Sequence, residues 1–288
     1  MLTKKYFLFF ITSLLLFASA CASQPKAVFD YDASVPFDVK INLQTERDGV
    51  TITDLSYASY DPNFSPSMHG RTVAYLVTPQ GDGPFAGMIY MHWLGNANNS
   101  RKEFLDEAVQ LAQHGVVCLL PQGYYPWMSF PTQDNNDRPL IIGQIIEMRR
   151  AVDFLLTQPN IDSKRLGYVG HDYGALYGGV LSGIDHRMRT YILIAGSPSF
   201  GDLDPYWNYK SNVPDLDPIN YLSKANPASL FFQFGRRDQA VPEEQANRFY
   251  ESASSPKRIE WYDDNHQILN APARQDRQSW LMEHLNLK

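Results

Sequence analysis

Cysteine is scarce in this 288-residue chain, which contains only Cys21 and Cys118. Because we expect Cys21 to be modified or cut away with the N-terminal segment, one thiol remains and no disulfide can form within the chain. The fold must therefore be stabilised by its own hydrophobic core. The sequence also lacks heptads, fixed-period repeats and metal-ligand spacings such as CxxC or HExxH, so neither a repeat architecture nor a metal site is expected.

Clusters of basic residues are absent as well. The 25 Lys and Arg residues are outnumbered by 31 Asp and Glu residues, and the formal net charge is −6. This acidic balance argues against binding to a phosphate backbone, so we expect no nucleic-acid partner. The length allows one large α/β domain or two small domains.

Residues 1–20 have the layout of a secretory signal peptide. Lys4 and Lys5 supply positive charge, residues 6–17 are almost wholly apolar, and small residues follow at 18–20. Such a segment directs export and is removed from the mature chain. Its apolar run is shorter than a membrane-spanning helix requires.

Cys21 follows these small residues directly, which resembles a bacterial lipobox, although Ala18 stands where leucine is usual. That resemblance implies a lipid on Cys21 and a lipid-anchored protein of the bacterial cell envelope, on the periplasmic or the outer face. The alternative is an ordinary signal peptide that is cut near residue 20. The polar residues 21–36 suit a tether, and residues 37–288 remain for the folded domain.

Beyond residue 37, the apolar pattern predicts extended segments first and then strands that alternate with helices. Extended segments or strands are expected at 38–43, 50–57, 72–78, 86–92, 116–120, 165–169, 190–195, 229–233 and 258–262, and helices at 101–114, 139–157, 173–182, 243–252 and 273–286. This alternation indicates an α/β fold with a mostly parallel central sheet and helices on both faces. The first strands would join the sheet in antiparallel fashion.

Two long segments, residues 121–138 and 196–227, interrupt the alternation. Both follow the carboxyl ends of strands, where open α/β sheets bind ligands, and loops of this length usually form lids or binding loops. We therefore expect a short lid insertion at 196–227; the alternative is a surface segment whose aromatic side chains only pack against the domain. The candidate lid or substrate-contacting residues are Trp93, Tyr124, Trp127, Tyr206 and Trp207.

The most informative motif is Gly170-x-Asp172-x-Gly174, which lies between a predicted strand and a predicted helix. A residue at the tip of a tight strand-to-helix turn raises its side chain above the sheet, and larger side chains two positions away on either side would collide. The N-terminus of the following helix helps to stabilise a negative charge there. Asp172 is thus the candidate nucleophile, and His171 is expected to support the turn rather than to react.

From residue 86 to the end, the sequence resembles the α/β-hydrolase superfamily, in particular its dienelactone hydrolase-like and prolyl-oligopeptidase-like branch. The resemblance rests on the Gly170-x-Asp172-x-Gly174 turn, which we call the elbow, and on two further segments. These are Asp-Ser-Lys-Arg-Leu-Gly at 162–167, and residues 231–238 followed by Val-Pro at 241–242. It implies the α/β-hydrolase fold and a catalytic triad in the chain order nucleophile, acid, histidine.

Asp172, Asp238 and His266 offer this order. In the scheme that the resemblance implies, His266 acts as the base, and Asp238 accepts its other ring N–H and so orients the ring. Asp263 and Asp264 remain alternatives for the orienting acid because they lie close to His266 in the sequence. Asp238 is preferred because it comes just after a predicted strand.

Two backbone N–H groups should form an oxyanion hole. One is expected from Tyr173, the residue after the nucleophile. The other is expected from Leu94, because His92-Trp93-Leu94-Gly95 resembles the His-Gly-x segment of the superfamily, although Trp93 stands in place of the usual glycine.

The aspartate at position 172 departs from the serine or cysteine of most dienelactone hydrolase-like proteins and resembles the elbow of epoxide hydrolases and haloalkane dehalogenases. A carboxylate needs no base to attack saturated carbon, and the product is an alkyl-aspartyl ester. The sequence therefore predicts a hydrolase for a small, partly apolar substrate, which needs only side chains and water and no cofactor. Two alternatives stay open: an esterase or lactonase that tolerates the aspartate, and a catalytically inactive binding protein with the hydrolase fold.

The resemblance also implies candidates for activating the leaving group. For an epoxide these are the hydroxyls of Tyr206, Tyr209 and Tyr221, and for a haloalkane they are the indole N–H groups of Trp127 and Trp207.

Overall fold

The computed structural model describes residues 27–64, 69–94, 100–129, 131–132, 136–202 and 213–288. Within these residues, nine strands form one sheet in the order β1-β2-β3-β5-β4-β6-β7-β8-β9. The strands are β1 (Lys40–Arg47), β2 (Val50–Ala58), β3 (Arg71–Pro79), β4 (Phe85–Met91), β5 (Val116–Pro121), β6 (Ile161–His171), β7 (Thr190–Ile194), β8 (Ser229–Gly235) and β9 (Lys257–Tyr262). The helices are α1 (Leu105–Ala112), α2 (Asp137–Leu156), α3 (Tyr173–Ile184), α4 (Glu243–Glu251) and α5 (Ala271–His284).

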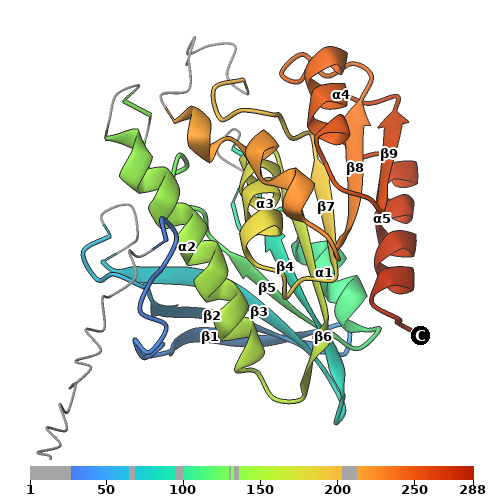
Figure 1. The fold of residues 1–288 in the computed structure, drawn as a ribbon. Coiled ribbons are helices and arrows are strands. Elements are labelled where there is room, and N and C mark those ends of the chain that lie inside the picture. Colours follow the sequence, from blue (N-terminus) through green and yellow to red (C-terminus); the bar gives the residue numbers. More distant parts are fainter. Residues whose placement is uncertain (1–26, 65–68, 95–99, 130, 133–135, 203–212) are drawn as a thin grey trace, which may run out of the picture.

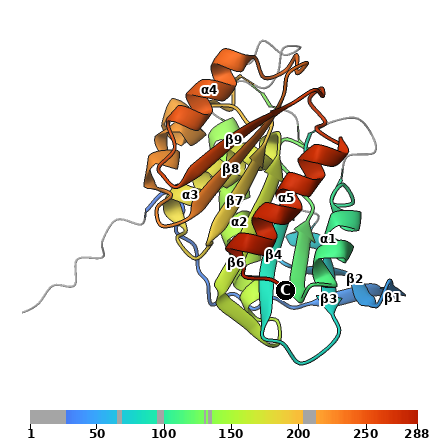
Figure 2. The ribbon, with the colours of Figure 1, turned by 90° about the vertical axis from the view of Figure 1, so that its right-hand side faces the viewer.

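The sheet begins antiparallel and continues parallel. β1 pairs with β2, β2 with β3 and β3 with β5 in antiparallel fashion, whereas all neighbours from β5 to β9 run parallel. Helices α2, α3 and α4 contribute to the core on one face of the sheet, and α1 and α5 to the core on the other (Figures 1 and 2). The predicted α/β fold, with its antiparallel start and its helices on both faces, is confirmed.

Most elements lie within a few residues of their predicted positions, and the larger differences have physical reasons. β1 extends to Arg47, four residues past its predicted end at 43. Every residue of this edge strand is exposed, so no alternation of buried and exposed side chains marks its ends. β6 begins at Ile161 rather than at 165, because its polar start pairs with β4 at Phe85 before the apolar run begins.

Residues 27–36 are irregular but folded against the domain. Phe29 is buried, and the carbonyl of Pro36 accepts a hydrogen bond from Arg150 of α2 at 3.1 Å. The described part of the segment expected to be a tether is therefore packed onto α2. The predicted signal peptide and Cys21 lie outside the described residues. In the part of the chain that the structure describes, we find no helix with the length and apolar character of a membrane span.

The described part of the 196–227 segment packs onto α3. It contains three short 3-10 helices, η1 (Pro214–Leu216), η2 (Pro218–Asn220) and η3 (Leu222–Lys224). Leu216 and Leu222 are buried, and a Cβ atom placed on Gly183 of α3 would lie 2.4 Å from the carbonyl oxygen of Tyr221. Three of the aromatic residues expected in a lid lie outside the described residues, namely Tyr206, Trp207 and Tyr209.

Candidate active site

The turn between β6 and α3 holds Asp172 at its tip. This residue has a φ of 57° and a ψ of −118°, a backbone conformation that non-glycine residues adopt only under strain. Its N–H donates to the carbonyl of Ile194 in β7 at 2.9 Å, and its own carbonyl accepts from the N–H groups of Ala175 at 2.9 Å and Leu176 at 3.0 Å. The neighbouring strand and the first turn of α3 therefore hold the strained tip in place.

Gly170 and Gly174 allow this turn because other parts of the backbone pass very close to them. A Cβ atom on Gly170 would lie 2.2 Å from the carbonyl oxygen of Gly174, and one on Gly174 would lie 2.3 Å from the carbonyl oxygen of Met91. Backbone atoms cannot move away as a flexible side chain could. Both positions thus require glycine for the reason that the sequence motif indicates.

The structure brings Asp172, Asp238 and His266 together. Nδ1 of His266 lies 2.8 Å from Oδ2 of Asp238, and Nε2 lies 3.6 Å from Oδ1 of Asp172, which is an ion-pair distance rather than a hydrogen bond. The Asp238 side chain is fully buried, and its Oδ1 accepts the N–H groups of Ala240 and Val241 at 2.8 and 3.0 Å. Asp238 is thereby fixed in the orientation that contacts the histidine.

The two rival acids have other partners. Asp263 is 85% exposed and pairs with Arg237 at 3.0 Å. Asp264 accepts the N–H of Asn265 at 2.8 Å and that of Asn270 at 3.0 Å, and so organises the loop that contains the histidine. The carboxylate that contacts the Nδ1 atom of the histidine is therefore that of Asp238.

The electrostatic surroundings of His266 favour its cationic form. Burial lowers the pKa of the ring, but the carboxylates of Asp172 and Asp238 raise it more strongly, and the resulting pKa is about 10. Opposite charges in contact stabilise the protonated ring in this way. The protonated form of His266 is therefore the favoured one in neutral solution.

Leu94 provides a backbone donor to the nucleophile candidate itself. Its N–H donates to Oδ2 of Asp172 at 2.8 Å, from the segment that follows β4. Tyr173, the other expected donor, is the first residue of α3, and its side chain is buried. Gly95 lies outside the described residues. One carboxylate oxygen of Asp172 is therefore held by the backbone, and the other faces His266.

Trp93 and Trp127 contact residues next to this site with their rings. The Trp93 ring stacks on His171, with centroids 5.3 Å apart and an interplanar angle of 6°, and lies 5.7 Å from the His266 ring. The Trp127 ring lies 6.2 Å from that of Tyr173. Both tryptophans are only partly buried. Trp93 therefore places apolar surface beside the imidazole of His266, and Trp127 places it beside Tyr173, the residue after Asp172.

Two expected roles of aromatic residues need correction. Tyr124 is completely buried, and its hydroxyl donates to the carbonyl of Arg71 and accepts the N–H of Val73 in β3, so it is a packing residue rather than part of a lid. The indole N–H of Trp127 donates to the carbonyl of Trp93 at 2.7 Å, so it is not directed at a halide. A buried aromatic residue and one that lines a pocket look alike in the sequence.

Tyr221, a third aromatic candidate, lies in the packed segment on α3. Its hydroxyl donates to the carbonyl of Asp215 at 3.0 Å. In this arrangement the hydroxyl is engaged with its own segment rather than with a leaving group.

Glu103 is a site residue that the sequence did not reveal. It lies just before α1, and its carboxylate contacts both the N–H of Trp93 at 2.8 Å and Nδ1 of His171 at 2.6 Å. No motif connects position 103 with positions 93 and 171, and an acidic residue near the start of a helix is ordinary. Among the described residues, no group of three or more His, Cys, Asp or Glu side chains is placed to hold a metal ion.

An elbow after β6, an acid after β8 and a histidine after β9, set on a mostly parallel sheet, define the α/β-hydrolase fold. No protein-family model and no curated protein sequence matches the chain. Solved structures do match it, and they include esterases and dienelactone hydrolase-like proteins that share this fold.

Three of these structures illustrate the likeness. Acetyl xylan esterase 1 from Thermoanaerobacterium sp. JW/SL YS485 has a TM-score of 0.67 and 15% identity, covering 88% of this chain and 90% of its own. The acetyl xylan esterase from Paenibacillus sp. R4 has a TM-score of 0.66 and 17% identity, covering 86% and 89%. A candidate dienelactone hydrolase from Klebsiella pneumoniae has a TM-score of 0.60 and 14% identity, covering 83% and 99%. At such identities, the likeness establishes the fold alone.

Proposed function

We propose that this protein is a hydrolase that uses Asp172 as its nucleophile, His266 as its base and Asp238 to orient that base. The substrate is a small, partly apolar molecule with an electrophilic saturated carbon, such as an epoxide or a haloalkane. The proposal rests on the fold, on the contacts among these three side chains, and above all on how the two oxygens of the Asp172 carboxylate are held.

The observation that carries the proposal is the hydrogen bond from the Leu94 N–H to Oδ2 of Asp172, at 2.8 Å. In an esterase with a serine nucleophile, such N–H groups bind the carbonyl oxygen of the substrate. Here the nucleophile's own oxygen engages the donor. This arrangement favours a reaction whose oxyanion forms on Asp172 over one whose oxyanion forms on the substrate.

In the first step, Oδ1 of Asp172 forms a bond to the substrate carbon. The bond from that carbon to the halogen or epoxide oxygen breaks, and its electron pair leaves with the halide or alkoxide. An alkoxide then takes up a proton, for which the His266 imidazolium is a source. The carboxylate needs no base for this attack, because it is already an anion.

In the second step, water attacks Cγ of the Asp172 ester while His266 accepts a proton from it. The oxyanion forms on Oδ2, where the Leu94 N–H already donates. The bond from Cγ to Oδ1 then breaks, and the product alcohol leaves with Oδ1 and a proton from His266. The oxygen of the water remains on Asp172, and the second proton of the water passes from the new carboxyl group to His266, which restores the carboxylate.

The charge of Asp172 couples the two steps. While Asp172 is an anion, it helps Asp238 to raise the pKa of His266 to about 10, and the ring is a poor base. Ester formation removes that charge and so lowers the pKa of His266. The histidine therefore becomes an effective base only when there is an ester to hydrolyse.

The surroundings support a small and partly apolar substrate. The Asp172 side chain is only 5% exposed, and the partly buried rings of Trp93 and Trp127 lie beside His266 and beside Tyr173, respectively. An apolar wall beside a buried carboxylate favours neutral molecules over charged ones.

The oxygen source of the product tests the proposal. The protein is given a single turnover of styrene oxide, bromobutane or para-nitrophenyl acetate in water enriched in heavy oxygen, and the peptide containing Asp172 is weighed. We expect label in Asp172 with the epoxide or the haloalkane. Ester turnover without label in Asp172 would instead establish an esterase, and the absence of any turnover or adduct would establish a non-catalytic binding protein.

Replacing the base separates the two steps. In His266→Gln we expect the substrate to remain attached to Asp172, because alkylation needs no base whereas hydrolysis does. Intact-protein mass spectrometry detects the adduct. His114→Gln is the control, since His114 is exposed and its ring contacts the C-terminal carbonyl at Lys288. Wild-type turnover in His266→Gln would refute the proposed triad.

Export and lipid attachment are a separate proposal, carried by the signal-like segment and Cys21 in the sequence. We expect a bacterial host to attach a lipid to Cys21 and to retain the protein in the membrane fraction. Metabolic labelling with a fatty acid checks this, with Cys21→Ser as the control. Equal labelling of the two proteins would argue for an unlipidated chain.

A further inference from the structure

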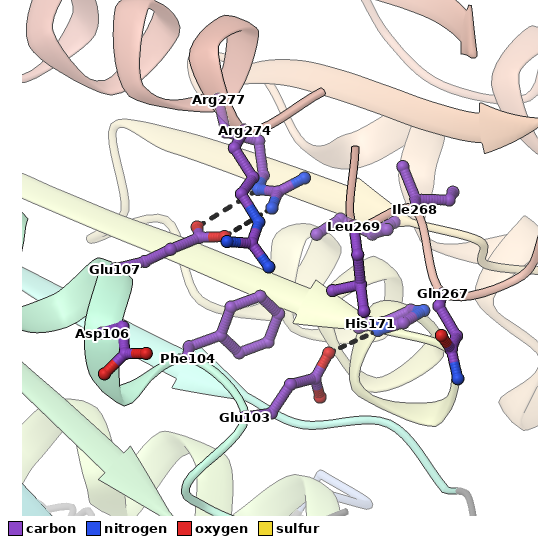
Figure 3. Close-up of a pocket in the computed structure, with 11 residues that line it drawn as sticks. Glu103, Phe104, Asp106, Glu107, His171, Gln267, Ile268, Leu269, Arg274 and Arg277 are labelled. Atoms are coloured by element: carbon purple, nitrogen blue, oxygen red, sulfur yellow. Dashed lines mark hydrogen bonds and ion pairs between the residues drawn. The ribbon is translucent and has the colours of Figure 1, made fainter. Parts of the chain in front are cut away.

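Glu103 and His171 form a contact beside the proposed triad that neither the nucleophile nor the base explains. Nδ1 of His171 lies 2.6 Å from Oε1 of Glu103, and both side chains are largely buried, with exposed fractions of 2% and 10%. Both side chains line a cavity of about 40 Å³ whose other lining residues come mainly from α1, α5 and residues 267–269. Figure 3 shows the two side chains facing each other. A buried, close contact of this kind needs a structural or a functional reason.

Each member of the pair also binds a different part of the site. Oε2 of Glu103 accepts the N–H of Trp93 at 2.8 Å, and the next N–H along the chain is the Leu94 donor to Asp172. Nε2 of His171 contacts the carbonyl oxygen of His266 at 2.9 Å. The pair therefore connects the backbone that holds the nucleophile with the backbone that carries the base.

The partners of the His171 ring show how both ring nitrogens are bonded. A backbone carbonyl only accepts, so Nε2 donates a hydrogen bond to the oxygen of His266. Nδ1 makes its hydrogen bond with the carboxyl group of Glu103, at 2.6 Å. His171 therefore joins the backbone of His266 to the Glu103 side chain through one hydrogen bond at each ring nitrogen.

His171 is also the residue immediately before Asp172, at the end of β6. It stacks on Trp93 with an interplanar angle of 6°, so its ring plane is defined by packing as well as by hydrogen bonds. A ring held in this way can fix the His266 loop relative to the elbow.

We propose that His171 and Glu103 are positioning residues, which align the Leu94 donor and the His266 base with the two oxygens of Asp172. This inference rests on the proposed function for its kinetic consequences, although the contacts themselves are independent of it. Neither residue touches the reacting atoms. Glu103 acts through the backbone N–H of Trp93, and His171 acts through the backbone carbonyl of His266. Because displacement of a catalytic group by about 1 Å can slow a reaction by about 100-fold, such alignment has a measurable effect.

The test uses two pairs of variants and measures alkylation and ester hydrolysis separately by rapid mixing with styrene oxide. His171→Phe keeps an aromatic ring against Trp93 but cannot hydrogen bond to the His266 carbonyl. We expect it to slow ester hydrolysis by roughly 100-fold and alkylation only slightly, so that the alkyl-enzyme accumulates. Equal slowing of both steps, or of neither, would overturn the role of His171.

Glu103→Leu and Glu103→Gln form the second pair. Leucine cannot accept the Trp93 N–H, so the Leu94 donor loses its support and we expect both steps to slow. Glutamine can accept that N–H through its oxygen and donate to Nδ1 of a neutral His171, so we expect rates within about tenfold of wild type. If glutamine were as damaging as leucine, hydrogen-bonded positioning would be the wrong explanation.

A second readout does not depend on turnover. We expect the Nε2 proton of His171, bonded to the carbonyl of His266, to be slow to exchange in the resting wild-type protein. The Nδ1 proton of His266, bonded to Asp238, should be slow to exchange in wild type and in Glu103→Gln and fast in His171→Phe. If wild type forms no alkyl-enzyme but these signals behave as expected, the proposed function fails and the positioning pair stands. Unchanged His266 exchange in a folded His171→Phe variant would overturn the pair itself.

Discussion

Replacing Asp172 with asparagine removes one of the two negative charges beside His266 and changes the size of the side chain very little. In the wild-type protein, the two carboxylates outweigh burial and raise the pKa of His266 from 6.5 to about 10. The same charge disappears when Asp172 becomes an ester. The variant thus mimics the alkylated enzyme and tests whether ester formation converts the histidine into a base.

The distances indicate the size of the effect. Oδ1 of Asp172 lies 3.6 Å from Nε2 of His266, whereas Oδ2 of Asp238 lies 2.8 Å from Nδ1 and remains in the variant. An opposite charge at such a distance raises a pKa by roughly one to three units, so we expect the pKa of His266 in Asp172→Asn to lie at about 7 to 9.

NMR titration of the histidine ring protons measures this change. Asp263→Asn is the matched control, because it also removes one carboxylate near His266 in the sequence. That carboxylate is 85% exposed and pairs with Arg237 rather than with the histidine. We expect the control to leave the pKa of His266 unchanged. A pKa near 6.5 in wild type, or near 10 in Asp172→Asn, would refute the electrostatic coupling.

The free energy of unfolding should depend on pH through the same His266 proton. Because the folded protein binds the His266 proton more tightly than the unfolded chain does, this contribution is fully present below about pH 6.5 and is lost as the pH rises toward 10. In Asp172→Asn this contribution to the free energy of unfolding should be smaller than in wild type, and it should be lost completely at a lower pH. Urea unfolding at several pH values compares the two proteins, and parallel stability curves would contradict this linkage.

Two further predictions concern packing. Gly170→Ala should destabilise the fold by about 1 to 3 kcal/mol in urea unfolding, because the new Cβ would lie 2.2 Å from a backbone oxygen in the first turn of α3. Gly49→Ala is its control. A Cβ atom on Gly49 would have no atom within 4 Å, so this variant loses stability only through its positive φ. Glu107→Leu should lower the free energy of unfolding by about 3 to 5 kcal/mol, because it leaves the buried Arg277 guanidinium without its carboxylate. Its control is Asp106→Ala, which removes the neighbouring carboxylate. That side chain is 76% exposed, so the free energy of unfolding should change by less than about 1 kcal/mol. Equal losses within either pair would contradict the packing argument.

The fold was predictable because its signals are local. A strand covered on both faces is an apolar run, and the helices that cover it carry apolar residues at helical spacing. The exceptions lie where such signals weaken, as in β1, whose side chains are all exposed. The elbow was also predictable, because the crowding at Gly170 and Gly174 selects glycine within five residues of chain.

The rest of the site depends on contacts between distant segments. Tyr124 was expected in a lid but is buried, because an aromatic side chain in a loop packs inward or outward according to its surroundings. Glu103 was not expected in the site at all, since its importance comes from Trp93 and His171, which only folding brings to it.

The sequence by itself determined the α/β architecture, the elbow and the identity of Asp172 at its tip, because each is encoded by neighbouring residues. Only the tertiary structure decided which carboxylate contacts His266 and where the oxygens of Asp172 point, because hydrogen bonds between segments remote in the chain set both. The elbow thus brings an aspartate to the end of β6, and the Leu94 N–H directs one oxygen of that aspartate away from His266 and leaves the other facing it.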